Sequence, residues 1–327
     1  MKPAMTHLEL QSKEARRGVT AKPRATIILP MLFAAALMVC GSARAQVGGV
    51  PLDGFPGVGE PPRVVLLDPG EGEKSELRFR FSAGSIHEMV MTIRMSNPQA
   101  PEIHLPGIRY PMVTEVLEAN EDRARVHVSI PTDPDLVDAE DAPPELVANL
   151  MRGLQSMSSF RAQITITSLG VTEEMEFQFD TGNPGLEQFH ESIRQSLSQL
   201  TRPFPIEPVG VGARWQTLKR IASPVTVYQL ETFELLRHAG SSVTLGMKVE
   251  QLIPMQSIAS PEAPPGATVD VAGSGEGSGE VIQDMHSPVL QSHSSLNSVT
   301  TTTVHVGDEV YETITNVAIV VDIEPRG

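Results

Sequence analysis

The chain has 327 residues and a net charge of −15, with 40 acidic against 25 basic side chains. Proteins that bind nucleic acids neutralise phosphates with an excess of Lys and Arg, so this balance excludes nucleic acid as a partner. The length suits one large β domain or two ordinary domains. With one Trp and three Tyr, the core must consist mainly of aliphatic side chains and Met.

The N-terminus has the three parts of a secretory signal peptide. A basic stretch precedes an uncharged, mostly apolar run at residues 27–40, and Ala43-Arg44-Ala45 follows as an A-x-A cleavage signal. The run has 14 residues, whereas a permanent transmembrane helix needs about 20. We therefore predict a signal peptide over residues 1–45 and an exported protein, periplasmic or secreted, with no transmembrane anchor after cleavage.

Two other processing routes stay open. Cys40 is a candidate for lipidation, although Val39 precedes it where a lipoprotein signal prefers a smaller residue, and the Arg16-Arg17 pair suggests twin-arginine export. Removing the net +5 of residues 1–45 leaves a mature charge of about −20 and no cysteine. The mature chain therefore has no disulfide and no thiol nucleophile.

Residues 46–73 are rich in Gly and Pro, which predicts a flexible leader with a possible short strand at 64–67. Apolar and polar residues then alternate, which is typical of half-buried antiparallel strands. The first two predicted strands, 76–81 and 89–95, are separated by a hairpin turn at 83–85. The others are 112–117, 123–130, 160–167, 171–179, 214–221, 225–236, 243–252, 267–272, 280–285, 294–306 and 310–323.

Two segments have the apolar period of a helix instead. Residues 143–157 and 184–200 each place Leu, Val, Ile, Met or Phe on one stripe, and Pro184 suits a first helical position after Asn183. The pattern predicts a mainly β (β-rich α+β) protein with a curved antiparallel sheet or half-barrel of about a dozen strands and two amphipathic helices. A Pro-rich connector at 201–208 separates residues 74–200 from 209–327, two lobes of one sheet or domain.

The most conspicuous local motif is Gly273-Ser-Gly-Glu-Gly-Ser-Gly-Glu280. It lacks the third glycine of a dinucleotide fingerprint and the Lys of a phosphate loop. The interpretation that we favour is a flexible hairpin tip or a bulged strand pair. Glu276 and Glu280 are at most weak cation ligands.

No catalytic, cofactor or metal motif is found in the sequence. The histidines do not have metal-ligand spacing, and no G-x-S-x-G elbow is present. We therefore predict a protein that is not an enzyme and has no cofactor. A hydrolase with a scattered site is kept as an alternative.

Candidate ligand-lining residues come from apolar side chains at special places. Met89, Met91 and Ile93 share one strand face, and flexible thioethers suit an adaptable cavity as well as an ordinary core. Trp215 follows a glycine pair and is either packed in the core or part of a ligand wall. The second helix contributes Phe189 and Ile193.

The chain resembles an uncharacterised family of exported proteins from Gram-negative bacteria, a domain of unknown function. The resemblance rests on Leu77-Arg-Phe-Arg-Phe-Ser-Ala-Gly84, Pro208-Val-Gly-Val-Gly-Ala-Arg-Trp215, Tyr228-Gln-Leu and Gly277-Ser-Gly-Glu280. It implies no activity and no catalytic residues. At the level of fold alone, the strand series is similar to the half-barrel of periplasmic lipoprotein carriers, although this chain is longer.

Three functions follow from these patterns. The first is an exported, non-enzymatic envelope protein that binds a hydrophobic small molecule, such as a lipid or acyl chain, in a curved sheet. The second is a structural or interaction module whose partner is an envelope protein. The third is the hydrolase.

Overall fold

The computed structural model describes residues 45–155, 160–178, 197, 200–222, 225–258 and 267–326. All of them belong to one compact unit, Leu32–Gly327. The protein is mainly β, as predicted, and its principal element is a 13-stranded antiparallel sheet that does not close. The strand order is β10-β9-β7-β6-β5-β17-β16-β15-β14-β13-β12-β3, with β8 paired to β6.

Twelve of the strands follow one another as antiparallel neighbours across the sheet. Their bounds are β3 Arg63–Asp68, β5 Ile86–Ser96, β6 Gly107–Ala119, β7 Arg123–Ser129, β9 Arg161–Thr167, β10 Thr172–Gln178, β12 Arg214–Ala222, β13 Thr226–Ala239, β14 Ser242–Ile258, β15 Thr268–Asp284, β16 Leu290–Val306 and β17 Glu309–Arg326. The short β8, Asp135–Val137, is added beside β6. Strands from both predicted lobes thus belong to one sheet, which is continuous through the pairing of β5 with β17.

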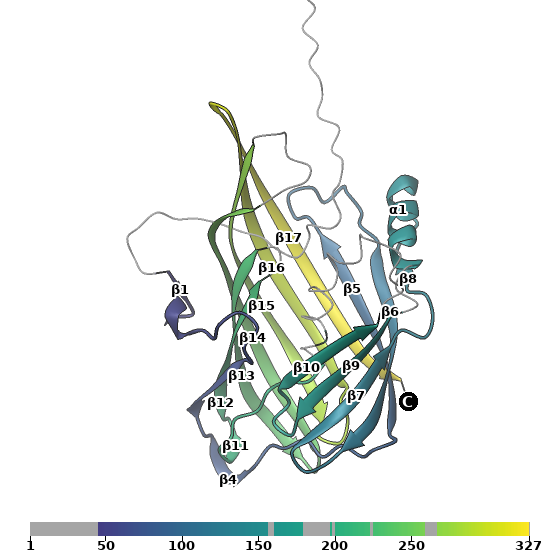
Figure 1. Ribbon diagram of the computed structural model, residues 1–327, viewed down its shortest axis with the longest axis vertical. Coiled ribbons are helices and arrows are strands. Elements are labelled where there is room, and N and C mark those ends of the chain that lie inside the picture. Colours follow the sequence, from purple (N-terminus) through teal and green to yellow (C-terminus); the bar gives the residue numbers. More distant parts are fainter. Residues whose placement is uncertain are drawn as a thin grey trace, which may run out of the picture. The chain divides into compact units, whose positions relative to one another are not determined.

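The sheet curves so that both of its flanks bury one apolar face together. In Figure 1, β7, β9 and β10 cross in front of the long strands β13 to β16. Val126 and Ile164 from the first flank lie in the same core cluster as Trp215, Phe233 and Leu245 from the second. We call the face that carries these side chains the inner face.

The predicted flexible leader is instead built into the fold. It contains β1 (Gln46–Val47), β2 (Val50–Pro51), a short 3-10 helix (Leu52–Gly54), β3 and the start of β4 (Glu71–Ser75), which pairs with β11 (Val209–Val211). Val47 and Phe55 pack on the outer side of the sheet against Leu218 and Leu230. Burial of these side chains outweighs the flexibility that the Gly and Pro content suggested.

The strand predicted at 76–81 does not form. Leu77 and Phe79 are buried in the core, which explains the alternation, but this extended segment belongs to no strand. The amides of Phe79 and Arg80 donate instead to the carbonyl oxygens of Ser168 and Met285. The turn predicted after it is present, with Gly84 at φ 80°.

One of the two predicted helices lies within the described residues. It is α1, Pro144–Gln155, which buries Leu146, Leu150 and Leu154 and lies beside β8 (Figure 1). The helix predicted at 184–200 falls almost entirely outside the described residues.

Candidate functional site

The structure separates the six predicted lining residues into three groups. Met89 and Trp215 are fully buried in the main core cluster. Trp215 stacks on Phe233 with ring centroids 5.7 Å apart, and its indole N–H donates to the Pro203 carbonyl at 3.0 Å. This tryptophan is therefore packed against its neighbours on the inner face.

The other predicted residues differ in position. Met91 and Ile93 lie on the same face of β5 as Met89 but are only half-buried. Phe189 and Ile193 lie outside the described residues.

Side chains on the inner face form rows that run across the strands. The aromatic row contains Trp215, Phe233, Met247, Gly279, Ser294, Val321 and Ile93. The second row contains Thr217, Glu231, Val249, Gly277, Leu296, Ile319 and Met95. The third contains Lys219, Gln229, Gln251, Gly275, Ser298 and Val317. In the second and third rows, β12 to β14 supply mostly polar residues, and β16, β17 and β5 supply mostly apolar ones.

The polar end of these rows is a connected chain of side chains, which we call the polar ladder. Gln251 donates to Gln229 at 2.7 Å, and Gln229 donates to Glu231 at 2.9 Å. The other carboxylate oxygen of Glu231 lies 2.8 Å from Lys219 Nζ. Glu231 is 1% exposed and Lys219 9%. Charged groups are rarely buried to this extent, so the ladder is the most unusual feature of the inner face.

A second cation reaches the ladder from the predicted connector. Arg202 is 4% exposed and interacts electrostatically with both Glu231 and Lys219. Its neighbours hold the backbone in place, because Thr201 Oγ1 donates to the Gly170 carbonyl at 2.9 Å and Pro203 accepts from Trp215. The connector is thus fixed to the core on both sides of the guanidinium.

Burial and charge perturb the pKa values of all three ions. Loss of solvent lowers the pKa of Arg202 and of Lys219, and the Glu231 carboxylate only partly offsets this. For Glu231, loss of solvent raises the pKa, but the two cations together with the hydrogen bonds lower it further, so the carboxylate pKa lies below its ordinary value. The structure therefore favours an ionised carboxylate beside two cations that lack sufficient solvation.

The glycine motif has a different place from the one predicted. Gly273, Gly275, Gly277 and Gly279, which we call the glycine lane, all face inward from the middle of β15, between β14 and β16. It is not a hairpin tip, and the bulge of the β14–β15 pair lies at its edge, between Ile253 and Gln256. A Cβ at Gly277 would lie 2.4 Å from the Ser295 carbonyl oxygen, and one at Gly279 would lie 2.6 Å from that of His293. Glycine is needed because the curved strands approach too closely for side chains.

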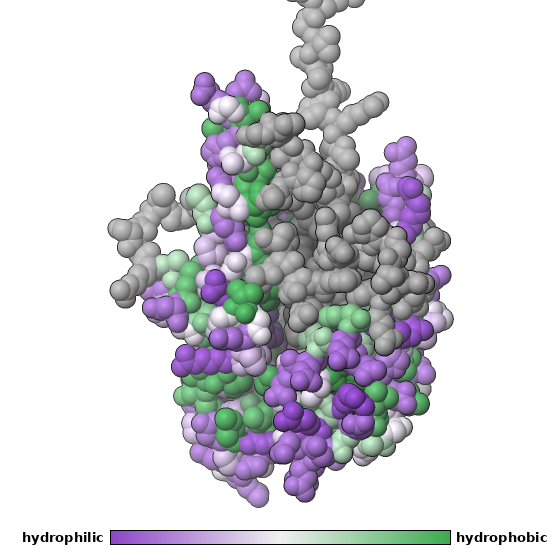
Figure 2. Space-filling view, in the orientation of Figure 1, coloured by the Kyte–Doolittle hydropathy of each residue, from purple (hydrophilic) through white to green (hydrophobic). Residues whose placement is uncertain are grey.

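The apolar end of the rows lies on the other side of the glycine lane. Leu296 is half-buried, whereas Ile319 and Val317 are 8% and 6% exposed. Figure 2 shows a band of hydrophobic residues that runs along the long strands. The inner face therefore combines a charged flank and an apolar flank, with a strip of bare backbone about 20 Å long between them.

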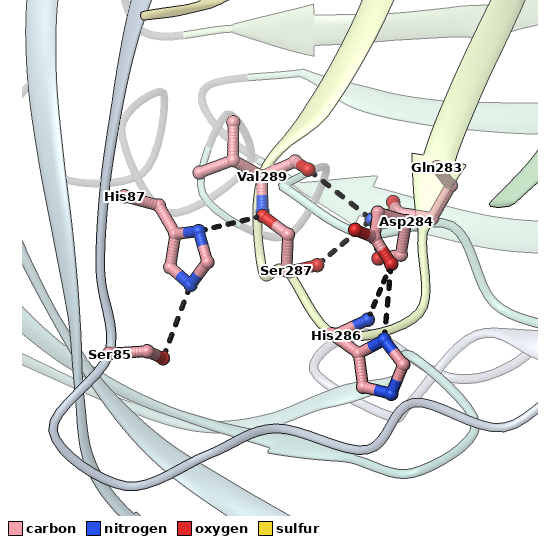
Figure 3. Close-up of polar contacts among 7 residues, drawn as sticks. All are labelled: Ser85, His87, Gln283, Asp284, His286, Ser287 and Val289. Carbon is pink, nitrogen blue, oxygen red and sulfur yellow. Dashed lines mark hydrogen bonds and ion pairs between the residues drawn. The ribbon is translucent and has the colours of Figure 1, made fainter. Parts of the chain in front are cut away.

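A second polar cluster surrounds His87 at the end of β5 (Figure 3). The His87 ring contacts Ser287 Oγ at 3.3 Å through Nδ1 and Ser85 Oγ at 3.2 Å through Nε2. Asp284 accepts from the backbone N–H of His286 rather than from His87. Both ring nitrogens of His87 therefore face hydroxyls, whereas in a Ser-His-Asp triad one of them faces a carboxylate.

Neighbouring bonds indicate that the His87 cluster stabilises a turn. Gln283 is completely buried and donates to the carbonyl oxygens of Asp284, Ser287 and Val289. The Ser287 hydroxyl accepts from the Val289 amide at 3.1 Å. These contacts hold the connection between β15 and β16, so the cluster has a structural explanation.

Sequence reasoning missed the polar ladder, although a signal was present. Lys219 occupies the same parity of β12 as Trp215 and Ile221, and Glu231 the same parity of β13 as Phe233. A charged residue at an inward position of an alternating strand is a departure from the pattern. Arg202 gave no such signal, because apolar and polar residues do not alternate regularly in the connector at 201–208.

Within the described ranges, no three His, Cys, Asp or Glu side chains gather as a metal site. The same residues contain no helix with the length and apolar character needed to cross a bilayer. No protein-family model and no curated protein matches the chain.

Proposed function

We propose that the protein is an exported, non-enzymatic component of the cell envelope that binds an amphiphilic ligand on the inner face of its open sheet. The observation that carries this proposal is the composition of the second and third rows. They place buried polar groups on β12 to β14 and apolar side chains on β16, β17 and β5, with the glycine lane between them. Concave sites with apolar walls and a few placed polar groups are typical of small-molecule binding.

Retention of charge in this position supports a binding role. Replacing a buried ion pair by apolar side chains is often neutral or stabilising, so stability alone gives little reason to keep Lys219 and Glu231. On the same face of its strand, Glu231 lies two residues from Phe233, and Lys219 lies four residues from Trp215.

Binding of a neutral hydrophobic probe tests the proposal. We expect the exported protein to bind N-phenyl-1-naphthylamine with a rise in probe fluorescence. Leu296→Arg, which puts a charge on the apolar flank, should weaken binding about tenfold or more, since a buried unpaired charge is unfavourable.

The matched control is Ile314→Arg, because Ile314 is 52% exposed on the opposite face of β17. Thermal unfolding of each variant establishes that it is folded, and Leu296→Ser replaces Leu296→Arg if the arginine variant is not. Absence of probe binding to the unmodified protein, or equal weakening by the two arginine variants, would contradict the proposal.

A second candidate function is an interaction module, and one observation favours it. β5 pairs with β17 only from Ala318 onward, so residues 309–317 have a strand edge without a partner among the described residues. Val310, Tyr311 and Ile314 are 60%, 55% and 52% exposed on this segment. Exposed strand edges of this kind can accept an added strand.

A further inference from the structure

Among the described residues, the charges buried on the inner face do not balance. Arg202 and Lys219 are cations and Glu231 is the one carboxylate among the described residues that interacts with both. All three are at least nine-tenths buried. The cluster therefore carries a net charge of about +1 in a protein whose total charge is −15. Buried charges are normally paired, so this cluster is one anion short.

Hydrogen-bond donors are also left over. Within the described part of the chain, nothing accepts a hydrogen bond from Arg202 Nε or Nη1. Lys219 Nζ has three donors, and apart from its ion pair with Glu231, no described residue accepts a hydrogen bond from it. Most buried donors in proteins have a partner, so several unsatisfied donors on adjacent cations indicate a missing acceptor.

The cluster is connected to the more open part of the inner face. The polar ladder ends at Gln251, which is half-buried. A Cβ on Gly275 would lie 3.2 Å from the amide oxygen of Gln251, so the glycine leaves room for this side chain. The glycine lane then continues past Leu296 on the apolar flank.

From this arrangement we infer that Arg202 and Lys219 bind the anionic headgroup of the amphiphile, while its apolar chain lies along the glycine lane against the apolar flank. The inference rests on the proposed function and adds the chemical class of the ligand. A headgroup with one negative charge neutralises the cluster. Arg202 Nε and Nη1 each offer an N–H to an anion, and hydrogen bonds from a guanidinium to a carboxylate or phosphate are charge-assisted and strong.

Two kinds of amphiphile share this chemistry, a fatty carboxylate and a phosphorylated lipid. The experiment compares hexadecanoate, hexadecyl phosphate and hexadecanol, each displacing N-phenyl-1-naphthylamine from the exported protein. We expect at least one anion to bind tenfold or more tightly than hexadecanol. The anion that binds more tightly shows whether the headgroup is a carboxylate or a phosphate.

Variants then locate the charge. Arg202→Met and Lys219→Met should each remove most of the preference for the anion and leave hexadecanol binding within about twofold. Arg125→Met and Lys248→Met are the matched controls, because both side chains are exposed and Arg125 is paired with Glu118. Each control should keep the full preference.

The outcomes separate this inference from the proposed function. If hexadecanol binds as tightly as both anions, the headgroup site is wrong while the amphiphile function stands. The same holds if the anion preference survives in Arg202→Met and in Lys219→Met. If none of the three amphiphiles displaces the probe and the probe itself does not bind, the proposed function fails. Arg202→Lys, which retains the charge, replaces Arg202→Met if that variant is unfolded, and should keep part of the preference.

Discussion

Two levels of the same inner face differ sharply over two to four residues along the strands. At the aromatic row, Trp215 and Phe233 stack and are completely buried. At the next rows, the same two strands bury Lys219 and Glu231 as an ion pair. The backbone pairing is continuous through both levels. Close packing and buried charge thus share one sheet, and only the first of them is explained by stability.

The largest expected effect is a loss of stability at the aromatic row. Trp215→Ala removes a completely buried ring that contacts Phe204 and Phe233, and should lower the free energy of unfolding by about 3–5 kcal/mol. Urea titration followed by circular dichroism measures it. Tyr311→Ala, at a side chain that is 55% exposed, is the control and should change stability by about 0.5 kcal/mol or less. Similar losses in both variants would refute the assignment of Trp215 to the core.

The buried ion pair between Lys219 and Glu231 is tested by removing the carboxylate. Glu231→Gln keeps the shape of the side chain but leaves Lys219 and Arg202 without a counter-charge, and should cost about 3 kcal/mol. The double variant Lys219→Met with Glu231→Leu removes the pair and keeps the net charge of the cluster. It should cost less than Glu231→Gln alone. Urea titration measures the free energy of unfolding of both variants. A larger loss in the double variant than in Glu231→Gln would show that the ion pair itself stabilises the fold.

The glycine lane connects the two levels, and its close approach can be tested. Gly277→Ala places a methyl group 2.4 Å from the Ser295 carbonyl oxygen. Overpacking of this kind should lower the free energy of unfolding by about 1–3 kcal/mol. Ser278→Ala, at the next residue on the exposed outer face, is the control. A Gly277→Ala protein that melts at the unmodified temperature would mean that the strands are less tightly curved here.

The smallest effect concerns His87, a polar residue on the inner face near the start of β5. Burial lowers the pKa of His87 below its ordinary 6.5, and Asp284 opposes this only in part. The unfolded chain therefore binds the proton at higher pH than the folded chain does. Stability contributed by neutral His87 is present above pH 6.5 and is lost as the pH falls through the lowered pKa. Melting temperatures between pH 8 and 5 should fall less in His87→Gln; parallel profiles would contradict this.

The sequence predicted the fold class because alternation is a local property. Residues at every second position of β7 and β9, such as Val126 and Ile164, are buried by whatever covers that face. The same reasoning failed at Leu77 and Phe79, where alternation marks burial but no neighbouring strand is available for pairing. The glycine motif was misplaced for a similar reason, since glycine suits both a turn and a close approach of strands.

The candidate site was predicted only in part. Met91 and Ile93 lie on the inner face, as their parity indicates, whereas the charges that define the site come from elsewhere. Lys219 and Glu231 are 12 positions apart and meet because β12 and β13 pair with Leu218 opposite Leu230. That register depends on the turn and on packing at both faces, which no local pattern contains.

The amino-acid sequence by itself determined an acidic chain with a mainly β architecture, and its N-terminal pattern predicts export. These properties follow from composition and short-range period, which do not depend on how distant segments meet. Only the tertiary structure buried Arg202, from a segment without period, within electrostatic range of Glu231. The reason is physical: the curvature of the sheet sets which inward positions fill with apolar contacts and which retain charge, and curvature is a property of all the strands together.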